Sequence, residues 1–197
     1  MSNIKLAIVG ATGAVGREFL RILAEQQFPA ENLFLVASSK SAGKAIKYFE
    51  KIIEIEDLQL FDFSKASVAF FSAGSSVAES HASQAIEKGC TVIDNSSFFR
   101  NRDDLELIVP EVNGSRLEDL NLPAIIANPN CSTAQMVVAL KPFHDLFKIK
   151  RVDVATYQSV SGTGQSASEE LKEQSRKILD GEEPVSYTHL TLPTKSG

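Results

Sequence analysis

Short apolar runs alternate with segments of helical periodicity in the first part of the chain. The run IKLAIV (4–9) precedes VGREFLRILAEQ (15–26), and NLFLVAS (32–38) follows. Apolar side chains in the middle segment recur at i, i+4, i+7 and i+8, as on one face of a helix: Val15, Phe19, Ile22 and Leu23. Strand, helix and strand in this order predict a βαβ unit.

The alternation continues toward the middle of the chain. Further short apolar runs are VAFFSAG (68–74), CTVIDNS (90–96), LIVPEV (107–112) and AIIANP (124–129), with a helix from about Val77 to Lys88 that ends at Gly89. This order predicts an α/β fold, in which a mainly parallel sheet carries helices on both faces.

The pattern changes after a predicted helix of roughly 132–147. The run RVDVATYQSVSGTG (151–164) is longer and more strand-like, and Ser166 with Glu169 offers a capping box for the helical segment that follows. We interpret this part as the opening of a second domain.

Composition narrows the class of protein. The 197 residues are 43% hydrophobic and 23% charged, which is typical of a globular protein with an apolar core. A net charge of −5 with both signs interspersed argues against nucleic-acid or anionic-membrane partners. The N-terminus lacks a signal-peptide pattern and no run reaches membrane-spanning length, so we expect a cytoplasmic protein. Cys90 and Cys131 lack zinc-site spacing, and we expect two reduced thiols and no metal.

The stretch GATGAVG places Gly10, Gly13 and Gly16 directly after the first predicted strand and before the first predicted helix. Glycines there permit a tight turn and let main-chain N–H groups approach a pyrophosphate. The spacing is not the usual G-x-G-x-x-G, but the strand-turn-helix context favours a nucleotide site over a purely structural turn.

The second strand ends in ASSKSAGK, where an NAD-binding protein usually has an acidic residue for the ribose. Ser38, Ser39, Lys40 and Ser41 instead offer hydroxyls and a positive charge that suit a 2′-phosphate, which favours NADP; the alternative is an ordinary polar loop. The later stretch FSAG (71–74) ends in small residues, so Ala73 and Gly74 could let a cofactor lie against the backbone.

Cys131 comes after the turn-forming Asn-Pro-Asn and before an apolar helical pattern. Exposed N–H groups at a helix N-terminus favour thiolate over thiol and can hold an oxyanion. A lone cysteine is more often a small buried apolar residue, and Cys90 fits that description better than Cys131 does.

Four motifs together resemble the aspartate-semialdehyde dehydrogenase family. They are GATGAVG (10–16), SSFFR (96–100), NPNCST (128–133) and YQSVSGTG (157–164), and the resemblance covers residues 1 to about 184. The related N-acetyl-glutamyl-phosphate reductases share this layout but usually carry glycine where Asn130 stands, so the aspartate enzyme is favoured.

The resemblance implies an NADP-dependent enzyme of lysine, threonine and methionine biosynthesis that reduces aspartyl phosphate to aspartate semialdehyde through a cysteine thioester. It implies Cys131 as nucleophile, Arg100 as phosphate ligand, and Asn130 and Gln158 as substrate-binding residues. The cofactor contacts that it implies, together with those from the glycine loop and the strand ends, are Gly10, Thr12, Gly13, Ala14, Val15, Ser38, Ser39, Lys40, Ser41, Ala73, Gly74, Ser161 and Gly162. A homodimer or homotetramer is implied for the full-length enzyme.

The family also uses an acid/base histidine from farther along the chain. His81 and His144 fall on predicted helices as structural or surface residues, and His189 lies in VSYTHLTLPTKSG (185–197). This stretch matches nothing in the family and resembles a sequencing-library adaptor read as codons, so we interpret it as non-native.

We therefore predict three segments. Residues 1–131 form a Rossmann-type NADP-binding domain, residues 132–184 form the truncated start of an α+β catalytic and dimerisation domain, and residues 185–197 are a foreign tail. Without the family's histidine we expect this chain to be inactive. The alternative from another class is a stand-alone NADP-binding module in which Cys131 is at most a redox sensor.

Overall fold

The computed structural model describes residues 4–183, so the predicted tail and His189 lie outside the described residues. The chain forms two compact units that divide between Thr156 and Tyr157. The predicted domain boundary after residue 131 stays a prediction. None of the helices within 4–183 is both long and apolar enough to cross a membrane.

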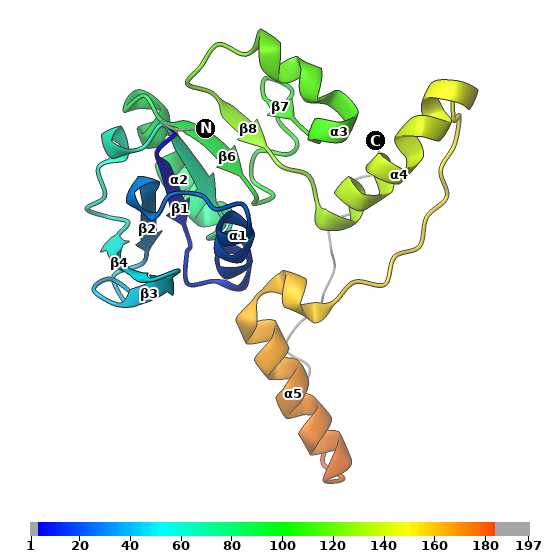
Figure 1. Ribbon diagram of the computed structural model, residues 1–197. Helices are drawn as coiled ribbons and strands as arrows, with labels where there is room; N and C mark the ends of the chain where they lie inside the picture. The colour runs from blue at the N-terminus through cyan, green and yellow to red at the C-terminus, as the bar shows by residue number, and fades with distance from the viewer. Residues whose placement is uncertain (1–3, 184–197) are drawn as a thin grey trace. The chain divides into compact units, whose positions relative to one another are not determined.

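The first unit is built on one sheet (Figure 1). Its strands lie in the order β3-β4-β2-β1-β5-β6-β8-β7, and every described pairing is parallel except that of β3 with β4. The bounds are β1 (Leu6–Val9), β2 (Leu33–Ala37), β3 (Ala45–Tyr48), β4 (Lys51–Asp57), β5 (Val68–Phe71), β6 (Thr91–Asp94), β7 (Glu106–Leu107) and β8 (Ile125–Ala127). The mainly parallel sheet predicted from the sequence is confirmed.

Helices connect the strands and continue into the second unit. The first unit holds α1 (Ala14–Glu25), α2 (Ser75–Glu87), α3 (Pro110–Asn113) and α4 (Cys131–Phe147), and the second holds α5 (Gln165–Leu179). Short 3-10 turns are η1 (Ala30–Asn32), η2 (Phe63–Lys65), η3 (Gly114–Asp119) and η4 (Val160–Thr163).

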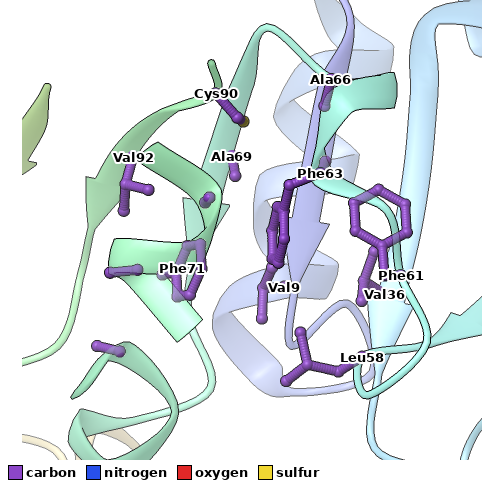
Figure 2. Packing of buried hydrophobic residues seen from close by; sticks show 14 of the residues in the cluster. Val9, Val36, Leu58, Phe61, Phe63, Ala66, Ala69, Phe71, Cys90 and Val92 are labelled. Atoms are coloured by element: carbon purple, nitrogen blue, oxygen red, sulfur yellow. The ribbon is translucent and has the colours of Figure 1, made fainter. Parts of the chain in front are cut away.

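Both faces of the sheet are covered, because alternate residues of a strand point to opposite sides. Leu6 and Ile8 of β1 belong to a cluster against which α1 packs through Phe19 and Leu23. Ala7 and Val9 belong to a second cluster, which includes Phe63, Phe71 and the alanines of α2 (Figure 2). All four residues of β1 are buried, so the apolar run IKLAIV reflects a strand enclosed on both faces.

Three local predictions were wrong, and one pair of strands was missed. Residues 107–112 are not one strand, because Pro110 occupies the first helical position of α3, where its missing N–H costs nothing. Residues 151–159 form no strand in the described chain, since a strand requires a partner for its main-chain groups. Helix α5 is capped by Gly164, so Ser166 lies inside the helix and makes no capping box. The hairpin of β3 and β4 was not predicted.

Helix α4 is long but poorly enclosed. None of its residues is buried, although its sequence is apolar. Phe143, Leu146 and Phe147 expose 58%, 75% and 75% of their surface, which is far more than the side chains of α1 and α2 that meet the sheet.

Candidate active site

The loops that follow five parallel strands gather at one edge of the sheet. Strands β1, β2, β5, β6 and β8 end at Val9, Ala37, Phe71, Asp94 and Ala127. Because parallel strands present their carboxyl ends on the same side, ligands of such sheets bind there. Every predicted site residue of the first unit lies in one of the loops after these strands or at the start of the helix that follows.

The glycine loop joins β1 to α1 through a tight turn (Figure 1). Gly10 has φ 91°, and its N–H donates to Val36 O at 2.8 Å, which ties the loop to β2. A Cβ at Gly10 would lie 2.9 Å from the carbonyl carbon of Ser72, and one at Gly16 would lie 2.4 Å from Gly10 O. Glycine at these two positions therefore lets three chain segments approach closely.

The start of α1 is open toward this edge. Gly13 is the N-cap and supplies no side chain to accept from the N–H groups of the first turn. Gly13, Ala14 and Val15 are exposed, and Val15 exposes 45% of its surface. An uncapped helix N-terminus leaves donors and positive partial charge for an anionic ligand, so the loop suits a pyrophosphate.

The loop after β2 lies beside a cavity of about 300 Å³. Ser38 and Ser39 line it, and Ser38 O accepts the N–H of Ser41 at 2.8 Å, which turns the chain away after these serines. Lys40 is exposed, and neither Lys40 nor Ser41 lines the cavity. The remaining wall comes from the segment after β4 and from α2, with Leu58, Gln59, Ser76, Val77, Ser80 and His81.

Gln59 and His81 line this cavity, although neither was predicted from the sequence as a site residue. Gln59 Nε2 lies 3.4 Å from His81 Nε2, and His81 Nδ1 is buried without a hydrogen-bond partner in the described part of the chain. The signal that could have found Gln59 is KIIEIED (51–57), which alternates like a strand and would have placed Gln59 at the same edge. Ala73 and Gly74 lie at the start of α2, both exposed.

Cys131 opens α4, one residue before the predicted helix start. Asn130 is the N-cap, and its Oδ1 accepts from Ser132 N at 2.9 Å and from Ser132 Oγ at 2.7 Å. The Cys131 thiol donates to the same oxygen with Sγ at 3.7 Å. Cys131 is exposed, so its sulfur stands at a helix N-terminus within reach of solvent. The role of Asn130 toward substrate stays a prediction.

Arg100 is half-buried and held by main-chain oxygens. Its Nε donates to Asn128 O at 2.9 Å and its Nη2 to Asn95 O at 3.0 Å. Burial lowers the pKa of Arg100, while the nearby Asp94 carboxylate and the Cys131 sulfur act in the opposite direction. The described ion pairs do not include Arg100, so a surface salt bridge, the plain alternative, does not account for this residue.

A buried carboxylate shapes the turn that carries Arg100. Asp94 is fully buried, and its Oδ1 and Oδ2 accept from Ser96 N at 3.0 Å and Ser96 Oγ at 2.7 Å. Ser96 Oγ also accepts the N–H of Phe98 at 3.1 Å. These bonds fold residues 94–98 back at the end of β6, and Phe99 inserts into the core, which brings Arg100 to the sheet edge.

The second unit contains the other predicted site residues. Ser159 Oγ lies 2.8 Å from Ser161 Oγ at the start of η4. A Cβ at Gly162 would lie 3.1 Å from Gln158 Nε2, so this side chain folds over Gly162. The cofactor and substrate roles of Gln158, Ser161 and Gly162 stay predictions.

Neither of the described histidines has been placed beside the Cys131 sulfur. His144 is on α4, thirteen residues from Cys131, which corresponds to about 20 Å along the axis at 1.5 Å per residue. His81 lines the cavity beside Ser38. Between residues 4 and 183, no cluster of three or more His, Cys, Asp or Glu side chains could hold a metal ion.

Two family models match the chain. One, described as the NAD binding domain of semialdehyde dehydrogenase, covers residues 5–120, and one described as its dimerisation domain covers residues 140–193. The aspartate-semialdehyde dehydrogenase of Legionella pneumophila is 50% identical over 179 residues, which are 91% of this chain and 52% of that protein. The chain therefore spans about half the length of the curated relatives it matches.

Solved structures give the same likeness. Aspartate semialdehyde dehydrogenase II of Vibrio cholerae, complexed with ASA, matches with a TM-score of 0.88 and 44% identity over 94% of this chain and 55% of that one. The Candida albicans aspartate semialdehyde dehydrogenase with NADP matches with a TM-score of 0.61 and 28% identity over 74% of this chain and 48% of that one.

Proposed function

This chain belongs to the semialdehyde dehydrogenase family, and from that premise we propose that it carries the cofactor edge and the nucleophile of an aspartate-semialdehyde dehydrogenase. The full-length enzyme would reduce aspartyl phosphate to aspartate semialdehyde through a thioester on Cys131. The observation that carries this proposal is the placement of Cys131 and Arg100 together, at the same sheet edge as the glycine loop.

The residues of this edge fit a dinucleotide. Gly10 and Gly16 leave no room for a Cβ, and the uncapped start of α1 offers N–H groups to a pyrophosphate. Ser38 and Ser39 line a cavity large enough for the adenosine end. A nicotinamide cofactor bound here would supply the hydride for the reduction.

We favour NADP over NAD for this edge. The loop after β2 carries Ser38, Ser39, Lys40 and Ser41 in place of an acidic residue, and a positive charge with hydroxyls suits a 2′-phosphate. The NADP named for the Candida albicans structure supports the same choice.

The chemistry assigned to this chain's own residues is nucleophilic addition and anion binding. The N-terminus of α4 and the Arg100 guanidinium can both stabilise an oxyanion formed on a carbonyl that the Cys131 sulfur attacks. The guanidinium of Arg100, which keeps N–H groups beyond those donated to the two carbonyls, also suits the phosphate that leaves aspartyl phosphate when the thiol attacks it, or that attacks the thioester in the reverse direction.

We infer that this chain by itself has little or no activity. His144 lies about 20 Å along α4 from Cys131 and His81 lines the other cavity, so neither supplies the acid/base group expected for the family. Phosphate-dependent reduction of NADP with aspartate semialdehyde, above the rate of a Cys131→Ser control, would refute this inference.

The cofactor proposal is tested by titrating the chain with NADP and with NAD. We expect Lys40→Ala to weaken NADP by about tenfold, the effect of one charged hydrogen bond, while the affinity for NAD changes little. Lys44→Ala, a lysine close by on the same loop, serves as the matched control. Equal losses for both cofactors would show that Lys40 does not read the 2′-phosphate.

The same preparation separates the enzyme from a stand-alone nucleotide-binding module. Fast alkylation of Cys131 by iodoacetamide near neutral pH favours the poised nucleophile, and inertness favours the module. A homodimer or homotetramer of the full-length enzyme and a cytoplasmic location remain proposals; the match to a dimerisation domain supports the first.

A further inference from the structure

Arg100 is fixed by carbonyls from the ends of two neighbouring strands. Asn95 O, just after β6, accepts from Nη2 at 3.0 Å, and Asn128 O, just after β8, accepts from Nε at 2.9 Å. Carbonyl oxygens orient a guanidinium without neutralising it, in contrast to a carboxylate partner. The direction in which Arg100 presents its charge therefore depends on the positions of these two carbonyls.

The same two asparagines are joined through their side chains. Asn128 Nδ2 donates to Asn95 Oδ1 at 2.6 Å, and we call this bond the asparagine clasp. The main-chain N–H of Asn95 donates to Phe71 O at 2.9 Å and that of Asn128 to Asp94 O at 2.8 Å, which extends the ladders of the sheet by one residue. Each asparagine thus uses its N–H for the sheet, its carbonyl for Arg100 and its side chain for the other asparagine.

The loop that contains Asn128 also positions the sulfur. Asn128, Pro129 and Asn130 lead directly into α4, where Asn130 caps the helix that begins at Cys131. Pro129 is buried, which limits the freedom of this loop. A displacement of Asn128 would therefore change the separation between the guanidinium and the thiol in two ways. It would move the carbonyl that holds Arg100, and it would move the loop that leads to Cys131.

We propose that Asn95 and Asn128 are positioning residues, and that the asparagine clasp sets the placement of the Arg100 guanidinium relative to Cys131. The inference rests on the proposed function in treating Arg100 as the ligand of an anion that reacts at this sulfur. Neither asparagine needs to touch substrate, because both act through Arg100 and through the loop before α4.

In the clasp Asn128 is the donor and Asn95 the acceptor, so two aspartate variants of equal charge affect it differently. Asn95→Asp retains an acceptor opposite Asn128 Nδ2, whereas Asn128→Asp replaces the donor by a second acceptor. Both variants add one negative charge beside the same guanidinium. Asn113→Asp is the control: Asn113 Nδ2 donates at 2.9 Å to the carbonyl oxygen of Leu107, the last residue of β7, so this variant also loses one donated bond, away from Arg100.

The readout is the rate of Cys131 alkylation by iodoacetate divided by the rate with iodoacetamide, together with protection by inorganic phosphate. The ratio reports positive charge near the sulfur, because the two reagents differ by one negative charge. Cys90 does not interfere near neutral pH, since it is buried and its pKa is raised to about 11. Peptide mapping identifies the alkylated cysteine.

We expect the wild-type chain and Asn113→Asp to show equal ratios and equal protection by phosphate. Asn128→Asp should give a ratio about threefold to tenfold lower than that of Asn95→Asp and should lose the protection, as one displaced charge implies. Equal ratios in Asn95→Asp and Asn128→Asp would overturn the positioning role. A wild-type chain with neither iodoacetate preference nor phosphate protection would overturn the anion role of Arg100 proposed above, and this inference with it.

A second set of variants keeps the test decisive if Asn128→Asp does not fold. In the cycle of Asn95→Ala, Asn128→Ala and the double variant, a clasp that acts as a unit predicts that the double variant lowers the ratio no more than either single one. Strictly additive effects would contradict the proposal.

Discussion

The contact between Gly16 and the glycine loop gives the sharpest prediction about stability. A Cβ at Gly16 would lie 2.4 Å from Gly10 O and 2.9 Å from the Cα of Ala11, so Gly16→Ala forces one of these segments to move by roughly 0.6 Å to reach 3.0 Å. Both obstacles are main chain, which cannot rotate away as a side chain could. Gly10 O also accepts the N–H of Gly13 at 3.0 Å, so the displacement strains the turn itself.

Two effects oppose each other in this variant. Alanine in a helix interior is favoured over glycine by about 1 kcal/mol, whereas overpacking costs about 1–3 kcal/mol. The difference is a net loss of up to about 2 kcal/mol in the free energy of unfolding for Gly16→Ala. Gly114→Ala is the matched control, because Gly114 has φ −59° and its Cβ would meet only Pro110 Cβ, at 3.8 Å. That change should stabilise the chain by about 0.4–1 kcal/mol.

Urea unfolding followed by far-ultraviolet circular dichroism measures both variants against the wild type. The affinity for NADP should fall in Gly16→Ala and stay constant in Gly114→Ala, because only the first moves the loop that we propose to bind the pyrophosphate. A Gly16→Ala chain that gains as much stability as Gly114→Ala would show that the loop yields without cost, and the argument from close approach would fail.

Three further predictions concern the core. Burial raises the pKa of Cys90 from 9.0 to about 11, so the stabilisation that comes from keeping this thiol protonated is complete below pH 9 and is lost as the pH rises to 11. Relative to Cys90→Ala, the wild type should therefore lose about 2–3 kcal/mol of unfolding free energy over this interval in urea titrations. Phe63→Ala should cost about 3–5 kcal/mol, because Phe63 is 1% exposed between Phe61 and Phe71; a cost below 1 kcal/mol would contradict this packing. Tyr48→Phe should cost about 1–3 kcal/mol in the same assay, because it leaves Phe28 O without the hydroxyl that donates to it at 2.9 Å; an unchanged midpoint would refute this.

The sequence predicted the centre of the sheet well and its margins poorly. Strand β1 is apolar at every position because both of its faces are covered, and such a run is easily recognised. Strand β4 lies next to the edge strand β3 and alternates exposed and covered positions. The segment KIIEIED therefore resembles a polar loop, and only the two-residue period of its apolar side chains indicates a strand. The helix predicted from the apolar period around α1 was correct, but Val15 and Ile22 expose 45% and 41% of their surface. Periodicity indicates which side of a helix is apolar, whereas tertiary contacts determine how much of that side is buried.

The parts of the candidate site that depend on one short stretch of sequence could be predicted, and the contacts between distant residues could not. The turn at GATGAVG and the helix start at NPNCST are local structures, so the sequence predicts both, while the roles of their residues stay predictions. The contacts of Arg100 with Asn95 and Asn128 join residues up to 28 positions apart, and only the pairing of β6 with β8 brings them together. The position of Gln59 in the wall of the cavity depends likewise on the missed strand β4.

The order of the parallel strands fixes the distances between the loops at their carboxyl ends. From β2, which ends just before the loop of Ser38 to Ser41, to β8, which ends just before the loop of Asn128 to Asn130, the order β2-β1-β5-β6-β8 contains four steps. At about 4.8 Å per step the two loops stand about 19 Å apart along the edge. Main-chain hydrogen bonds fix this interval. Substitutions in the loops can alter the side chains at either end, but the distance between the proposed cofactor-recognition site and the proposed nucleophile is set by the fold.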